Sequence, residues 1–285
     1  MEIVLIKRAI KIFLLLVIII SLVFVHLLHG EYGITGRLNR AIYDGNIIEL
    51  EKILKKCTKR EINSLPFNQM LARLMDFYNR TPLENACMSG EYQMAKLLIE
   101  YGADVNFTNP YTGRTPLLAA TYAPGKEEVK IVKFLIECGA DINVADNYGN
   151  TPLLGAVHLY YSDNMSEQES EYQKTGTENT IYLIEHCTSL EIKKHQHSNI
   201  LECAIANNNV PIVKYLIENH YFGISDFSEN GMTILHFAVK KNSVNVCKYL
   251  LEQGANQNIL DAEGKTAYDY ALENGSEDMI ALFNN

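Results

Sequence analysis

Basic residues are scarce in this 285-residue chain, which has 25 lysines and arginines against 34 acidic residues and a formal net charge of −9. Proteins that bind nucleic acid neutralise phosphates with clustered basic side chains, so this charge balance predicts a poor nucleic-acid binder, and no nucleic-acid partner is expected. Hydrophobic residues make up 47% and charged residues 21% of the chain. That composition is typical of a folded globular protein and excludes intrinsic disorder.

The sequence also lacks the short motifs of common enzymatic chemistries. It has no glycine-rich phosphate loop, no Gly-x-Ser-x-Gly, no His-Glu-x-x-His and no Cys-x-x-Cys. The densest imidazole pair, His195 and His197, has no third metal ligand close by in the sequence. We therefore expect no catalytic residue, no cofactor, no metal and no small-molecule substrate. An enzyme or metal-binding protein that uses the His195/His197 region is the alternative of another class.

The six cysteines are spread along the chain with no close pair. Most of them occupy helix positions where a small buried thiol fits, so free core thiols are expected, although an even count in an exported protein also allows disulfides. They are Cys57, Cys87, Cys138, Cys187, Cys203 and Cys247.

A long apolar run lies near the N-terminus. Residues 12–28 read IFLLLVIIISLVFVHLL and follow Lys7, Arg8 and Lys11. As a helix this run spans about 25 Å, slightly less than the roughly 30 Å hydrocarbon core of a bilayer. Because no small-residue cleavage site follows, residues 1–30 are predicted to be an uncleaved signal-anchor; a cleaved signal peptide and a buried soluble helix are the alternatives.

The basic residues before the apolar run predict the topology. By the positive-inside rule they lie in the cytoplasm, which places everything after Gly30 on the other side of the membrane. We therefore expect a single-pass membrane protein whose remaining residues are extracytoplasmic. If residues 1–30 are cleaved instead, the protein is secreted or periplasmic.

Two short strings recur along the rest of the chain. Thr-Pro-Leu, or a weaker version of it, begins at Thr81, Thr115, Thr151, Asn199, Thr233 and Thr266. A Gly-Ala-Asp/Asn-x-Asn string begins at Gly102, Gly139 and Gly254, with Cys187 and His220 in the glycine position of two degenerate copies. Once two internal insertions are removed, the period is 33 residues, which indicates a repeat architecture.

The recurring residues predict a helix, a turn, a second helix and a hairpin in each unit. Threonine caps a free backbone N–H at a helix start, and proline at the first helical position loses an N–H that had no partner. Glycine then ends the second helix in the left-handed conformation. Single units cannot bury their apolar faces, so the units are expected to stack.

Together these strings resemble the ankyrin repeat. The resemblance covers nearly all of residues 36–285 and is strongest in 77–150 and 229–262. It implies an all-α solenoid of about seven units, with an N-terminal capping repeat and insertion at 31–76, repeats at 77–260 and a C-terminal capping repeat at 261–285; both end units are expected to be polar. The histidine that follows Thr-Pro-Leu in the family survives only as His236, so the capping hydrogen bonds of other units, such as the one with Glu84, are left open.

Insertions interrupt the repeats at three places. The third unit has three extra residues within 122–128, and the fourth has fifteen within 158–180. The acidic, serine-containing segment 160–179 is expected to be a loop, either a solvated disordered spacer or a partner-binding loop. A further insertion before Thr81 contains Leu65 and residues 70–77, which are expected to form an added helix.

The resemblance implies a non-catalytic protein–protein interaction module, here tethered to a membrane through residues 12–28. In ankyrin-like arrays the hairpin tips and the exposed side of the first helices form a concave binding face. Refinements by analogy are a periplasmic immunity or inhibitor protein for an exported enzyme, or support of a periplasmic redox enzyme. The tips are rich in tyrosine and arginine, as interface hot spots are, although ordinary solvated loops would also fit. The candidate partner-binding residues are Tyr78, Arg80, Met88, Tyr111, Arg114, Tyr122, Asn147, Tyr148, Asn150 and His158.

Overall fold

The computed structural model describes residues 33–65, 80–123, 128–157, 167–186, 200–225, 230–274 and 276–284. The apolar run at 12–28 and the expected added helix at 70–77 lie outside these ranges. Within them, no helix combines the length and the hydrophobicity needed to cross a membrane.

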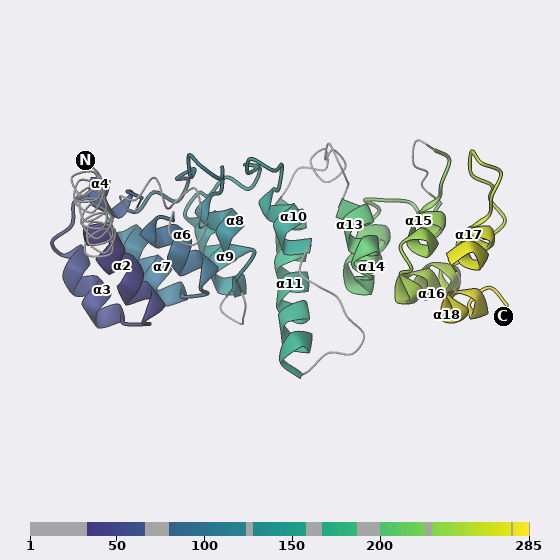
Figure 1. The fold of residues 1–285 in the computed structure, drawn as a ribbon, viewed down its shortest axis with the longest axis horizontal. Coiled ribbons are helices and arrows are strands. Elements are labelled where there is room, and N and C mark those ends of the chain that lie inside the picture. The colour runs from purple at the N-terminus through teal and green to yellow at the C-terminus, as the bar shows by residue number, and fades with distance from the viewer. Residues whose placement is uncertain are drawn as a thin grey trace, which may run out of the picture.

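The described residues form seven helix pairs that follow one another along a single axis (Figure 1). The expected all-helical solenoid is therefore confirmed. The short helix α4 (Lys59–Ile62), which the sequence analysis did not anticipate, follows the first pair. The pairs are α2 (Ile34–Tyr43) with α3 (Ile47–Leu54), α6 (Pro82–Met88) with α7 (Tyr92–Glu100), α8 (Pro116–Ala120) with α9 (Glu128–Glu137), α10 (Pro152–Val157) with α11 (Glu167–His186), α13 (Ile200–Ala206) with α14 (Val210–Glu218), α15 (Ile234–Lys240) with α16 (Val244–Glu252), and α17 (Ala267–Asn274) with α18 (Glu277–Ala281).

The recurring threonines start the first helices as the sequence predicts. Thr81 Oγ1 accepts a hydrogen bond from the amide of Glu84 at 3.2 Å, and Thr115 Oγ1 accepts one from Leu118 at 3.3 Å. In the sixth unit Thr233 and His236 form a reciprocal capping box. Each threonine thereby satisfies a backbone N–H that has no partner within its own helix.

Residues in the left-handed conformation end the second helices. Gly139 has a φ of +86°, and His220, which replaces glycine in a degenerate unit, has a φ of +59°. The turns between the two helices of a unit need the same conformation, which Asn208 and Asn242 adopt in the fifth and sixth units. Asparagine tolerates it because its short polar side chain costs less there than a bulkier one.

The buried apolar residues in the described ranges form one continuous core cluster. Small residues on the first helices, such as Ala86, Ala120 and Ala238, are fully buried, as are leucines of the second helices such as Leu98 and Leu250. Because alanine adds little bulk, adjacent first helices approach closely and each unit covers the apolar face of the next.

The fourth unit departs from the expected loop at 160–179. Helix α11 has 20 residues, whereas α7, α9, α14 and α16 have nine or ten. It begins at Glu167 and extends beyond the neighbouring helices (Figure 1). The segment from 167 onward is thus helical rather than a loop, because the insertion lengthens the second helix at its N-terminal end.

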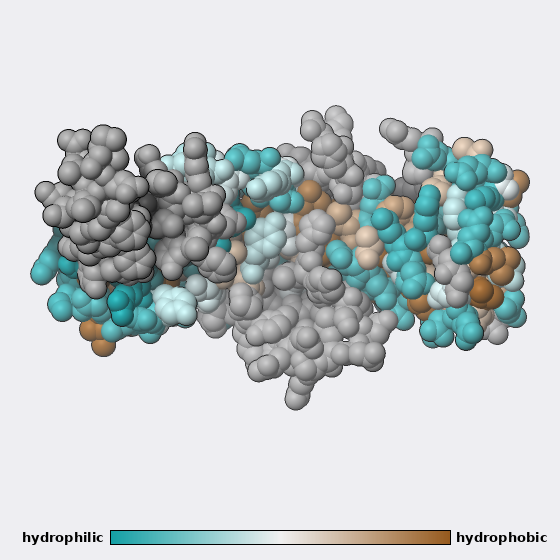
Figure 2. Space-filling view, in the orientation of Figure 1, coloured by the Kyte–Doolittle hydropathy of each residue, from teal (hydrophilic) through white to brown (hydrophobic). Residues whose placement is uncertain are grey.

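The end units are less polar than expected for solenoid caps. Tyr43 and Ile48 of the first unit, together with Leu272 of the last, are among the large apolar side chains that remain exposed. At the C-terminal end, hydrophobic residues reach the surface between hydrophilic ones (Figure 2). Both end units therefore expose apolar side chains that the expectation of polar caps did not include.

Candidate partner-binding face at the hairpin tips

One acidic or amide side chain organises each described hairpin from within. Asp146 Oδ1 accepts hydrogen bonds from the amides of Tyr148 and Asn150, both at 2.9 Å. Asn109 Oδ1 accepts one from the amide of Tyr111 at 3.1 Å. Both organising side chains are buried. Such local side-chain to backbone bonds fix the turn, so the tyrosine that follows two residues later has a defined position.

Neighbouring hairpins are joined by hydrogen bonds between their tips. The amide of Asn147 donates to the carbonyl of Thr112 at 2.9 Å, and its side-chain Nδ2 donates to the carbonyl of Tyr111 at 2.9 Å. The amide of Ala262 makes the same type of backbone contact to Asn230 at 3.1 Å, at the other end of the array. The tips therefore form a ladder rather than independent loops.

The ladder presents two tyrosines to solvent. The exposed fraction is 81% for Tyr148 and 40% for Tyr111. These residues were singled out from the sequence, and the structure places them on adjacent tips. Aromatic side chains held in this way lose little conformational entropy on binding, which makes them effective anchors.

Arg114 and Tyr122 form a second part of the face, below the tips. The guanidinium carbon of Arg114 lies 5.8 Å from the centre of the half-buried Tyr122 ring, within the range of a cation–π contact. Burial raises the pKa of the Tyr122 phenol, and the charge of Asp146 raises it further, while Arg114 opposes the shift. Tyr122 is therefore a neutral hydrogen-bonding group at physiological pH.

Several other candidate residues have structural tasks. Arg80 is only 8% exposed, so the expectation that it contacts a partner from the surface is wrong; its carbonyl accepts a bond from Asn39 at 3.2 Å. Met88 is half-buried and packs against the core. Asn150 uses its side-chain amide on Asp146, at 3.1 Å. Candidates Tyr78 and His158 lie outside the described residues.

Sequence reasoning missed the buried polar groups beneath the face. Glu84 is buried in α6, and its Oε2 accepts a bond from Asn109 Nδ2 at 3.1 Å. Burial raises the pKa of Glu84 to about 7, although Asn109, Arg80 and Arg114 lower it. A detectable signal existed: an Asn or Asp recurs at the base of each hairpin, as Asn109, Asp146 and Asp261.

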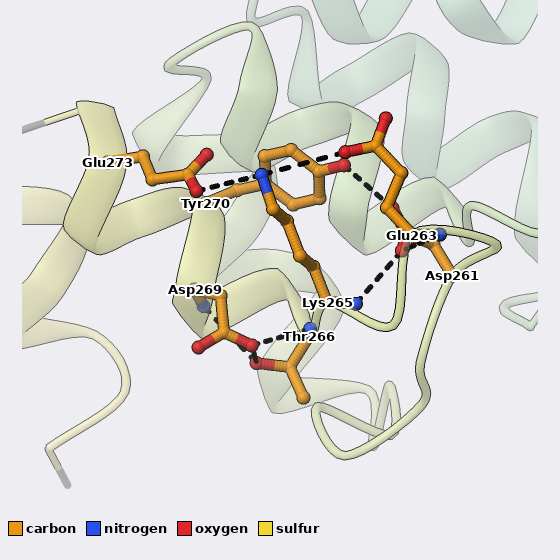
Figure 3. Close-up of polar contacts among 7 residues, drawn as sticks. All are labelled: Asp261, Glu263, Lys265, Thr266, Asp269, Tyr270 and Glu273. Atoms are coloured by element: carbon orange, nitrogen blue, oxygen red, sulfur yellow. Dashed lines mark hydrogen bonds and ion pairs between the residues drawn. The ribbon is translucent and has the colours of Figure 1, made fainter.

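The last hairpin shows the same construction with more charges (Figure 3). Tyr270 donates to Asp261 Oδ2 at 2.7 Å, and the amide of Lys265 donates to Asp261 Oδ1 at 3.0 Å. Lys265 Nζ lies 2.8 Å from Glu273 and 3.6 Å from Glu263. The hydrogen bond to Asp261 raises the pKa of Tyr270 to about 12. These contacts stabilise the hairpin, and they occupy most of the polar groups of the cluster with one another.

The part of the chain that the structure describes holds no group of three or more His, Cys, Asp or Glu residues arranged to bind a metal ion. His195 and His197 lie outside that part. Cys57, Cys87, Cys138, Cys203 and Cys247 have free thiols. Burial raises the pKa of the Cys247 thiol to about 12, so this thiol is a packing group rather than a nucleophile.

The repeats match family models of the ankyrin repeat. One model matches residues 78–107, a second matches 112–147, and a model of three consecutive ankyrin repeats matches 201–284. The chain is an ankyrin repeat protein. The resemblance inferred from the Thr-Pro-Leu and Gly-Ala-Asp strings is thereby confirmed.

Solved ankyrin repeat structures share the fold. The human ASB11 ankyrin repeat domain is 24% identical and has a TM-score of 0.62; the match covers 87% of this chain and 96% of that one. The ankyrin repeat protein EF0377 is 26% identical, has a TM-score of 0.53, and matches over 71% of this chain and 96% of its own. No curated protein sequence matches the chain.

Proposed function

We propose that this ankyrin repeat protein is a non-catalytic interaction module that holds a protein partner against its hairpin tips. The ordered, exposed pair Tyr111 and Tyr148 carries the proposal. Ankyrin solenoids suggest protein binding, and the tip ladder supplies two aromatic anchors with Arg114 beneath them. Arginine and tyrosine are enriched among the residues that dominate interface energies.

A photocrosslinking amino acid placed at position 148 tests this proposal in the cell of origin. Tyr148 is so exposed that the substitution should not disturb the core. We expect a discrete protein adduct whose yield falls strongly when Tyr111→Ala and Arg114→Ala are introduced, because each hot spot contributes about 2 kcal/mol or more.

A matched control places the same crosslinker at exposed Leu272, with Lys248→Ala and Lys214→Ala as the accompanying substitutions. No discrete adduct is expected there. Equal adducts from positions 148 and 272, or an adduct at 148 that survives the tip substitutions, would show that the hairpin tips are not the binding face.

We further propose that residues 12–28 tether the module to a membrane with the repeats on the extracytoplasmic side. The apolar run and the preceding Lys7, Arg8 and Lys11 support this orientation. An immunity or inhibitor role towards an exported enzyme fits that location as the more specific candidate. Fusion of alkaline phosphatase after Asn285 should give an active enzyme, and a fluorescent protein at the same point should be dark; the reverse pattern would place the repeats in the cytoplasm.

A further inference from the structure

Charge is segregated along the solenoid. Residues 33–65, which form α2, α3 and α4, contain seven basic and four acidic residues. Residues 66–285 contain 15 basic and 28 acidic residues. The first unit is therefore positive, in contrast to the acidic array that follows it.

The first unit also exposes apolar side chains next to one another in sequence. The exposed fraction is 88% for Tyr43, 39% for Ile47 and 78% for Ile48. They lie at the end of α2 and the start of α3, on either side of the connecting turn. A solenoid cap that faced only water would carry polar residues there.

On both α2 and α3, the exposed basic and apolar side chains lie on the same side of the helix. Arg37, Arg40 and Tyr43 follow one another at intervals of three residues on α2, which places them on one side of that helix. On α3 the corresponding exposed stripe begins at Ile48. We call this the N-terminal surface; it consists of Arg37, Arg40, Tyr43, Ile48, Lys52 and Lys55.

Three of these basic groups have acidic neighbours on their own helix. The distances are 3.6 Å from Arg40 to Asp44, 3.1 Å from Lys52 to Glu49 and 2.9 Å from Lys55 to Glu51. Ion pairs this exposed contribute roughly 0–1 kcal/mol, because solvent screens them. The cations can therefore exchange these partners for another anion.

The length of the connection decides what can reach this surface. Only residues 29–32 separate the apolar run from Gly33, and a fully extended chain spans at most about 3.6 Å per residue. If residues 12–28 are inserted in a bilayer, the first unit lies within about 18 Å of its surface. No later unit has such a short connection to the membrane.

We propose that the N-terminal surface lies on an anionic bilayer, with Tyr43 and Ile48 in the headgroup region and the basic residues beside lipid phosphates. This inference rests on the proposed membrane tether. Tyrosine and aliphatic side chains favour the membrane interface, and anionic lipids attract lysine and arginine clusters. The same lipids repel the acidic units, so the array is directed away from the membrane and its hairpin tips stay accessible.

The absence of tryptophan makes the proposal directly measurable. In the full chain, Ile48→Trp introduces a single indole into the N-terminal surface, and Leu272→Trp introduces one at an exposed position of α17 as the matched control. Both variants are reconstituted into vesicles of phosphatidylcholine alone or with phosphatidylglycerol, and each vesicle type is also prepared with brominated lipids that quench tryptophan.

We expect brominated lipids to quench Ile48→Trp strongly in the anionic vesicles and at least about threefold less in vesicles of phosphatidylcholine alone. Leu272→Trp should not be quenched in either vesicle type. Adding Lys52→Glu and Lys55→Glu should remove the quenching in anionic vesicles, because these substitutions replace two of the four positive charges of the N-terminal surface with negative ones and so cancel its net charge. Circular dichroism verifies that the helices persist in each variant.

Flotation of the vesicles in alkaline carbonate tests the tether separately, because an inserted helix resists extraction. If the chain floats but Ile48→Trp is unquenched, the tether stands and the proposed lipid contact is wrong. Equal quenching at positions 48 and 272 would also overturn it. If the fluorescence of the tryptophan at position 48 changes with protein concentration but is not quenched by brominated lipids, a second copy of the chain covers this surface instead.

Discussion

Glu84 takes the place that His236 has in the sixth unit. His236 Nδ1 lies 2.8 Å from Thr233 Oγ1, and its Nε2 lies 3.1 Å from the carbonyl of Lys265, so one ring links the cap to the next hairpin. Glu84 links to the next hairpin through Asn109, but its Oε1 is buried without a hydrogen-bond partner. Its charged carboxylate form is therefore poorly solvated, and this burial raises the pKa of Glu84 to about 7.

We predict that Glu84→Gln makes the free energy of unfolding less dependent on pH. The folded state raises the pKa from 4.5 to about 7, so the wild-type contribution is fully present below pH 4.5 and is lost as pH rises through 7. The variant should match the wild type near pH 4 and be more stable at pH 8, by up to about 3 kcal/mol. Denaturant titration at both pH values measures the free energy of unfolding, with the exposed Glu252→Gln as control. If this free energy changes equally with pH in Glu84→Gln and the wild type, the prediction is wrong.

Gly139 illustrates a purely conformational requirement. Its φ is +86°, and a Cβ added there would meet no atom within 4 Å. Gly139→Val should lower the free energy of unfolding by about 1 kcal/mol or more through backbone strain alone, with Gly139→Asn costing less. The denaturation midpoint reports both effects. Equal midpoints for valine and glycine would mean that the left-handed turn relaxes without cost.

Between elements, the contact of α10 with the preceding unit depends on Gly155. A Cβ at this position would collide with the Thr121 side chain and lie 3.1 Å from Leu118. Thr121 cannot move freely, because its hydroxyl donates to the carbonyl of Leu118 at 2.8 Å. A glycine inside a helix is thus retained although alanine has the better helix propensity.

We therefore expect Gly155→Ala to destabilise the protein by about 1–3 kcal/mol, whereas helix propensity alone would predict a gain of nearly 1 kcal/mol. Thr121→Ala should restore part of the loss in the double variant, since it removes the colliding hydroxyl. A double-mutant cycle by thermal denaturation measures the coupling. A stabilised Gly155→Ala variant would show that the helices separate easily.

The sequence predicts elements well where one residue type has one physical task. The threonine caps at Thr81 and Thr115 and the glycine at 139 are of this kind, and the structure contains each of them. The N-terminal extension of helix α11 was not predicted, because inserted polar residues such as those at 167–176 suit both a helix and a solvated loop. Arg80 was misplaced because repeat position alone does not determine which way a side chain packs.

At the scale of the whole molecule, stacking produces the candidate face. No unit holds it alone: Tyr111 comes from one hairpin, Tyr148 comes from the next, and Asn147 joins the two. The asparagine that ends the string at Gly102 adds a second link, since Asn106 Nδ2 donates to the carbonyl of Gly139 at 2.9 Å. Consecutive units are thereby fixed in register, and so are the side chains that they present.

Hydrogen exchange on the full chain, alone and with the protein crosslinked from position 148, tests most directly whether this face binds the partner. We predict that amides in 111–114 and 146–150 exchange about tenfold more slowly in the complex, while those of α14 and α16 are unchanged. Protection confined to the helices, or none at the tips, would contradict the proposed binding through the hairpin ladder.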